Sequence, residues 1–202
     1  NKSGEFGEPA VIFTMDEGCR ILLSAVDRQD RIHLVWIDKN SSTDRDSGNI
    51  HHAFLINGII EGHKIVYDQG NALKPDIAVD KDGDCHISFQ KVKQGEIYRE
   101  YKIGYLRSID DVFQSVLFTF MEKYINLRPF TKLTVLPDGS VYFMINPASQ
   151  DLYVMKFKNG TFTHPRKIYD LDVFSSSGNQ YIISDANGAV HLFFMDDKDF
   201  DY

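Results

Sequence analysis

Residues 75–89, PDIAVDKDGDCHISF, are the stretch of sequence that decides the fold. Apolar residues occupy every second position on both sides of the pair Asp82-Gly83. Such alternation is typical of a strand with one buried face, and Asp-Gly between two alternating runs indicates a β-hairpin. We therefore expect two antiparallel strands joined by an exposed turn at Asp82-Gly83. The side chains expected on the buried face are Ile77, Val79, Ile87 and Phe89.

The same pattern is repeated three more times along the chain, in residues 22–36, 132–145 and 181–194. The four turns are 53, 56 and 49 residues apart when they are aligned at Asp30, Gly83, Gly139 and Gly188. A second repeat, made of a polar turn, an apolar anchor and a strand, runs in phase with the first. Its anchors are Phe6, Ile60, Phe113 and Phe162. A period near fifty residues indicates a repeat architecture built from one supersecondary unit.

A third element lies between these two, because short strand candidates occur at residues 49–56, 100–107 and 151–157. Each repeat therefore contains four strands in a meander, and no stretch shows the apolar spacing and caps of a helix. A four-stranded antiparallel unit with this period is typical of a β-propeller blade. We predict an all-β fold, a β-propeller of four-stranded antiparallel blades with about four blades in this chain.

The whole chain, residues 1–202, is expected to be a single propeller-like domain. Residues 1–17 would supply the outer strand of a closing or preceding blade, and residues 171–202 a partial blade. The complete blades are predicted at residues 18–68, 69–122 and 123–170. We expect a leading strand at residues 8–15 to pair with a strand within residues 180–195, or with the matching segment of another chain. Since the closing blade lacks a clear third strand, the alternative is a piece of a larger propeller.

The composition fits a folded domain, with 43% hydrophobic and 13% aromatic residues in a chain of 202. A formal net charge of −7 disfavours nucleic acid as a partner, and no apolar run is long enough to insert into a membrane. Only two cysteines occur, Cys19 and Cys85. Both fall in or beside expected strands, so we interpret them as small buried residues. We expect no disulfide, no metal and no cofactor, and a secreted or otherwise extracytoplasmic protein.

The pattern P-x-I-A-V-D-x-D-G-x-x-H-I-x-F at residues 75–89 resembles the repeat of the BNR, or Asp-box, sialidase-like propellers. Residues 108–113, SIDDVF, resemble a decayed Asp-box, whose family form is S-x-D-x-G-x-x-W. Asp111 stands where the family has Gly, and Phe113 replaces the Trp at a shortened spacing. The resemblance covers nearly the whole chain and implies the fold. It leaves the function open, because the family includes sialidases, other glycan-degrading enzymes, lectin-like modules and non-enzymatic scaffolds.

Propellers usually bind ligands around the central channel, near the first residues of each innermost strand. Cations recur there in three blades, at Arg20, Lys74 and Arg128, with Gln180 opposite them. We expect these side chains to line one cavity and to bind a carboxylate, as in an acidic sugar. Tyr98 is the expected aromatic platform for a sugar ring. The alternatives are exposed loop cations at strand starts and a Tyr98 that packs between blades.

Two further patterns suggest metal ions at first sight. His33, His86 and His191 share one blade position, but their strand lies one layer away from the channel. We therefore expect them to have structural roles. The acidic turn at residues 80–84 lacks the order of glycine and glutamate found in a calcium loop, so we expect a plain turn.

Three functions remain open at this point. The first is a sialidase-like propeller module that binds a glycan or a protein partner on its central-channel face. The second is a fragment of a glycan-degrading enzyme, either a glycoside hydrolase or a polysaccharide lyase. Arg20 and Arg128 would then be two of three sialidase arginines, although spacing assigns no Tyr/Glu pair and no acid. The third is a structural module whose self-association completes the ring.

Overall fold

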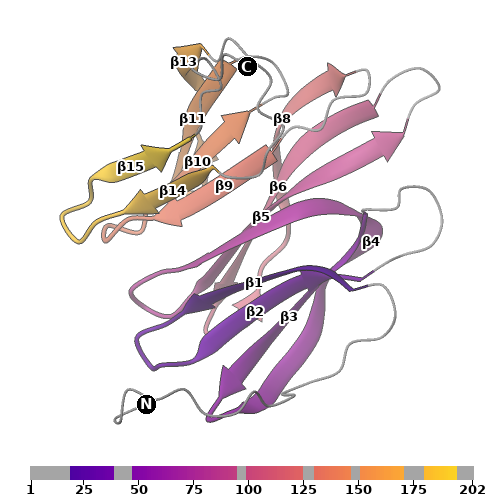
Figure 1. The fold of residues 1–202 in the computed structure, drawn as a ribbon, viewed down its shortest axis with the longest axis vertical. Helices are drawn as coiled ribbons and strands as arrows, with labels where there is room; N and C mark the ends of the chain where they lie inside the picture. The colour runs from indigo at the N-terminus through magenta and orange to yellow at the C-terminus, as the bar shows by residue number, and fades with distance from the viewer. Residues whose placement is uncertain are drawn as a thin grey trace, which may run out of the picture.

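The structure, a computed structural model, describes residues 19–38, 47–94, 99–124, 130–146, 151–170 and 180–194. Within these ranges every regular element is a β-strand and every strand pairing is antiparallel (Figure 1). None of the sheets that these residues form closes into a barrel. None of the described segments forms a helix that could span a membrane. The prediction of an all-β, antiparallel fold is confirmed.

The strands fall into four successive groups along the chain, and we call each group a unit. The first unit contains β1 (Arg20–Val26), β2 (Ile32–Ile37), β3 (Gly48–Ile56) and the first part of β4 (Ile59–Val79). The second contains the rest of β4, β5 (Cys85–Gln94), β6 (Arg99–Ile109), β7 (Val112–Phe113) and β8 (Leu117–Tyr124). The third contains β9 (Phe130–Val135), β10 (Val141–Asn146), β11 (Asp151–Lys158), β12 (Thr161–Phe162) and β13 (Arg166–Asp170). The fourth is the hairpin of β14 (Tyr181–Ser184) and β15 (Val190–Phe193).

One strand, β4, belongs to two units at once. Its residues 59–72 pair with β3 and its residues 72–79 pair with β5, so strands β1 to β8 form one continuous sheet. Gly70 and Lys74 have φ angles of 67° and 46°, which are left-handed conformations inside the strand. These residues lie where β4 changes partner. The predicted boundary between residues 68 and 69 therefore falls inside a single strand.

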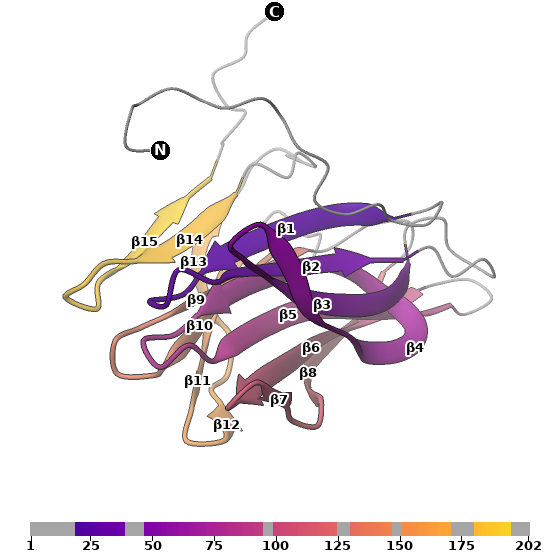
Figure 2. The same ribbon diagram turned by 90° about the horizontal axis from the view of Figure 1, so that it is seen from below.

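The four aligned turns share one backbone conformation. Each has a positive φ at the aligned position, namely 60° at Asp30, 89° at Gly83, 75° at Gly139 and 84° at Gly188. Glycine adopts this conformation without strain, and Asp tolerates it better than most residues. The turns lie on one side of the molecule in both views (Figures 1 and 2). Gly83 was expected to be exposed but is buried, because Gln29 and Arg31 of the preceding turn lie against it.

The core lies between consecutive units. One buried cluster joins Val35 and Ile50 of the first unit to Ile87 and Phe89 of the second. The expected burial of Ile87 and Phe89 is confirmed, since neither is exposed to solvent. Ile77 and Val79 are only partly buried. A second cluster joins the second unit to the third through Ile103, Tyr105, Leu133 and Phe143.

The first strands of the four units are neighbours in space: β1 contacts β4, β4 contacts β9, and β9 contacts β14. Both ends of this row expose apolar side chains, each with an exposed fraction between 49% and 61%. They are Leu22 and Val26 on β1, and Tyr181, Ile183 and Phe193 on β14 and β15. The predicted leading strand at residues 8–15 lies outside the described residues.

Candidate functional site

The ends of the strands opposite the four turns form the candidate ligand face. Strand β9 shows which side chains reach the junction between the second and third units. Leu133 and Val135 of β9 pack against Ile103 and Tyr105 of the second unit. Because side chains alternate along a strand, Thr131 points to the same junction, near the start of β9. Its side chain is buried, and its hydroxyl oxygen has no hydrogen-bond partner among the described residues.

Strand β5 contributes a second polar side chain at this junction. His86, Ser88 and Gln90 alternate on the face of β5 that is turned away from the buried Ile87 and Phe89. Strands β5 and β9 are in contact. Gln90 is 1% exposed, and neither its amide nitrogen nor its amide oxygen has a partner within the described ranges. Gln90 and Thr131 therefore bring unpaired donors and acceptors to one junction.

The next junction repeats this arrangement. Gln180 precedes β14 at the unit position that Thr131 occupies in β9, five residues before the turn. Ile182 packs against Met144 and Leu152 of the third unit, so alternation turns Gln180 toward that unit as well. Gln180 is 1% exposed, and both atoms of its amide are unpaired in the part of the chain that the structure describes. Burying a polar group without a partner costs about 1–3 kcal/mol, so such groups are ready to bind a ligand or an ordered water.

The predicted ligand-binding residues can be placed only in part. Gln180 lies at the candidate face, as just described. Lys74 is partly buried, has a partner, and adopts the left-handed φ of 46° at the bend of β4. Arg20 begins β1, and only its backbone is described. Arg128 and Tyr98 lie outside the described residues. The convergence of the three cations therefore stays a prediction.

A partly buried ion pair links two first strands near this face. The Asp76 carboxylate of β4 accepts a hydrogen bond of 2.8 Å from the backbone N–H of Leu133 and lies 3.2 Å from the Lys132 ammonium. Burial raises the pKa of Asp76, and the positive charge of Lys132 partly opposes this shift. Lys132 was not among the predicted cations, since it lies inside its strand and not at the start. This pair fixes β4 against β9 and so holds the two units in register.

The opposite end of the units carries a repeated pair of Asp and His side chains. The His33 Nε2 atom lies 3.2 Å from the Asp27 carboxylate, and the corresponding distances are 3.2 Å for His86 to Asp80 and 3.5 Å for His191 to Asp185. The same aspartates accept backbone N–H groups of their own turns. In all three pairs the aspartate lies six residues before the histidine, a regularity of the sequence that could have indicated the pair. Its place at the turns indicates a structural role.

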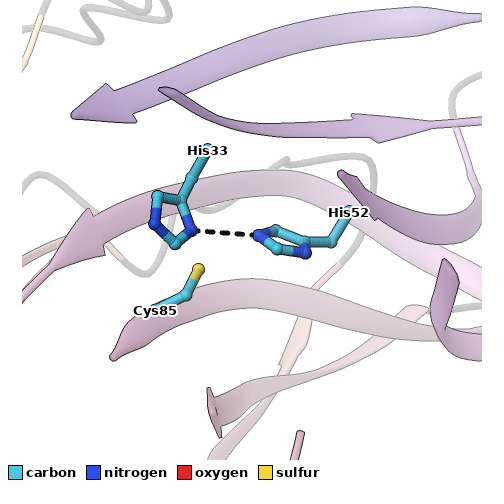
Figure 3. Close-up of side chains that lie close together, drawn as sticks. All are labelled: His33, His52 and Cys85. Carbon is cyan, nitrogen blue, oxygen red and sulfur yellow. Dashed lines mark hydrogen bonds between the residues drawn. The ribbon is translucent and has the colours of Figure 1, made fainter. Parts of the chain in front are cut away.

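One cluster in the described ranges has the chemistry of a metal site. His33 from β2 and His52 from β3 turn their imidazoles toward each other, and the Cys85 thiol at the start of β5 faces both (Figure 3). The potential ligand atoms of these three buried residues lie within 4.8 Å of one another. His33 Nδ1 and His52 Nε2 are 3.1 Å apart. Burial raises the pKa of the Cys85 thiol well above its usual value.

Comparison with known proteins adds information about the fold. No protein-family model and no curated protein matches the chain. Among solved structures, "Hadza microbial sialidase Hz136" is similar with a TM-score of 0.54 and 12% identity, over 82% of this chain and 39% of that one. A protein of unknown function from Dyadobacter fermentans DSM 18053 gives a TM-score of 0.44 and 10% identity, over 87% of this chain and 74% of that one. The likeness to the sialidase concerns the fold, and the chain spans 39% of that protein's length.

Proposed function

We propose that this chain is part of a sialidase-like β-propeller that binds a glycan on the face where the first strands of its units begin. Three observations support the propeller. The sialidase named above has a similar fold, and the first strands of consecutive units are neighbours. The exposed apolar side chains at both ends of the row are what further blades, or a second chain, would cover.

The buried, unpaired side chains of Gln90, Thr131 and Gln180 are the observation that carries the glycan proposal. Amides and hydroxyls both donate and accept hydrogen bonds, and so match the hydroxyl groups of a sugar. In our proposal Arg20, Lys74 and Arg128 add charge to this face and hold the carboxylate of a uronate or a sialate.

Binding of neutral and acidic oligosaccharides to immobilised protein tests the proposal. Thr131→Val removes the unpaired hydroxyl without changing the shape of the side chain. We expect it to weaken glycan binding about two- to tenfold, the equivalent of one hydrogen bond. The matched control is Thr134→Val on the same strand, because the Thr134 hydroxyl already bonds Ser184 away from this face. Equal effects of the two variants, or no binding of any oligosaccharide, would refute the glycan site.

The charge part of the proposal has its own test. Arg128→Ala should lower the affinity for acidic oligosaccharides about tenfold or more, which is the contribution of one charge-assisted contact. The affinity for neutral oligosaccharides should not change. If the protein bound only neutral sugars, the glycan site would be supported and the proposed carboxylate ligand would be refuted.

The second candidate function is a glycan-degrading enzyme of which this chain is a piece, either a glycoside hydrolase or a polysaccharide lyase. The observation that favours it is the similarity to a solved sialidase. Turnover of chromogenic sialosides and of polyuronates separates the two functions. A module that only binds would retain these compounds without cleaving them.

A further inference from the structure

We propose that His33, His52 and Cys85 bind one thiophilic transition-metal ion, either Zn²⁺ or Cu⁺, between the first two units. Thiolate and imidazole are the ligands that both ions prefer in proteins. The three residues come from three different strands and are all buried, so they form a preorganised set and not a surface cluster. An ion held there would join β2 and β3 of the first unit to β5 of the second.

The surroundings of His33 orient it as a ligand. Its Nε2 atom lies 3.2 Å from the Asp27 carboxylate, which also accepts a 2.6 Å hydrogen bond from Arg31. A proton on Nε2 is therefore held by Asp27, and the lone pair of Nδ1 points toward His52. A carboxylate behind a ligating histidine is the usual arrangement around protein-bound metals.

His52 changes its tautomer in the proposed binding step. Its Nε2 faces His33, while its Nδ1 is buried and has no partner among the described residues. When the ion binds, it takes the lone pairs of His33 Nδ1 and His52 Nε2, and the proton between them moves to His52 Nδ1. The Cys85 thiol loses its proton to solvent as the metal–sulfur bond forms. No electron is transferred, so the step needs no oxidant or reductant.

The second unit provides an internal comparison at the same positions. There His86 Nε2 lies 3.2 Å from Asp80, and His86 Nδ1 lies 2.7 Å from the Tyr105 hydroxyl. Tyr105 pairs with Ser88 as His52 pairs with Val35, so the two aromatic residues hold equivalent places. Val141 stands where the next unit's counterpart of Cys85 would be. The junction between the second and third units thus keeps the Asp–His pair and lacks counterparts of the His52 and Cys85 ligands.

The fixed charges around the cluster determine the net charge of the site with each ion. Arg31 bridges Asp27 and Asp111, and Lys64 donates to the Asp111 carbonyl, so the fixed charges nearly cancel. A Cu⁺ ion with the Cys85 thiolate would form a neutral centre with three ligands. A Zn²⁺ ion would leave one net positive charge and would need a fourth ligand, such as a water.

The test uses the whole chain, freed of metal and then loaded with Zn²⁺, or with Cu⁺ under a reductant, in the presence of a competing chelator. We expect about one ion per chain after desalting, measured by elemental analysis. Cys85→Ser and His52→Tyr should abolish binding, and Cys19→Ser, the matched control, should retain it. Asp27→Asn should weaken affinity about ten- to a hundredfold. His52→Tyr copies the pair of the second unit, and near-ultraviolet circular dichroism checks that each variant folds.

Binding of Co²⁺ gives a spectroscopic signal that reports the metal–sulfur bond directly and not the folding of the chain. Co²⁺ bound by the wild-type chain should give a sulfur-to-cobalt absorption band that disappears in Cys85→Ser. Combining Tyr105→His with Val141→Cys should create a second site and a second equivalent of metal. Wild-type protein that holds no stoichiometric ion in either arm would overturn the proposal. Loss of the ion in Cys19→Ser to the same extent as in Cys85→Ser would overturn it as well.

Discussion

The contact between Phe89 and Gly104 gives a sharp prediction about packing. The two residues lie opposite each other on β5 and β6, and Phe89 is not exposed. A Cβ atom added to Gly104 would lie 2.3 Å from Cζ of the Phe89 ring and 2.6 Å and 2.7 Å from the two Cε atoms. The ring fills this space completely, so Gly104→Ala forces it to move. Such overpacking costs about 1–3 kcal/mol of unfolding free energy.

Gly104→Ala should raise the free energy of unfolding, and not lower it, when Phe89 has been replaced by alanine. Phe89→Ala alone should cost about 3–5 kcal/mol, as expected for a buried phenylalanine. In that background Gly104→Ala meets no ring and restricts the unfolded chain, so it should stabilise by roughly 0.5–1 kcal/mol. The double-mutant cycle should therefore give a coupling energy of about 1.5–4 kcal/mol.

Urea unfolding measures this cycle, with fluorescence of the single tryptophan, Trp36, as the probe. Trp36 is 4% exposed and lies in the first unit, away from the mutated pair. The control background is Phe54→Ala, because the Phe54 ring lies against Gly62 and not against Gly104. Gly104→Ala should keep its full cost there. An equal cost of Gly104→Ala in the Phe89→Ala background would refute the packing argument.

Three further predictions follow from the turns, the candidate face and the chain ends. Hydrogen bonds from His86 and from the turn outweigh burial and lower the pKa of Asp80, so its ionised form stabilises the protein above the unfolded pKa of about 4. Asp80→Asn should cost about 1–3 kcal/mol at neutral pH, and this difference should vanish as the pH falls through the folded pKa in acid-unfolding curves. Thr131→Val should raise the melting temperature, since it removes a buried hydroxyl without a described partner; a lower value would contradict this. Residues 8–15 should show slow amide hydrogen exchange, and light scattering should tell closure within one chain from pairing between chains; fast exchange in the intact assembly would count against both.

The turns could be predicted from the sequence because their chemistry is local. Alignment of the repeats selected the four positions that carry a positive φ, including Asp30, where no glycine marks the turn. The Asp111 position, where the Asp-box has Gly, also has a positive φ of 62°. The exposure of a turn depends on its neighbours, and this is why the burial of Gly83 against Gln29 was not anticipated.

The candidate site could be predicted less well, for a physical reason. Alternation tells which face of a strand a residue occupies, but not which unit covers that face or whether a polar atom finds a partner. Gln180 was predicted to bind a ligand from its place in the repeat, and that role stays a prediction. Gln90 and Thr131 could be found only from the packing of the second unit against the third. His33, His52 and Cys85 come together through strand register and the docking of two units, which their spacing in the sequence does not encode.

The continuity of β4 has a consequence for the response of the molecule to force. Its 21 residues are hydrogen-bonded to β3 over one part and to β5 over the other, so tension along the chain is shared between two units there. By contrast, β14 and β15 form a separate two-stranded sheet, and each of these strands is only four residues long. In a pulling experiment the C-terminal hairpin should detach first at low load, and β1 to β8 should then yield together in one large step.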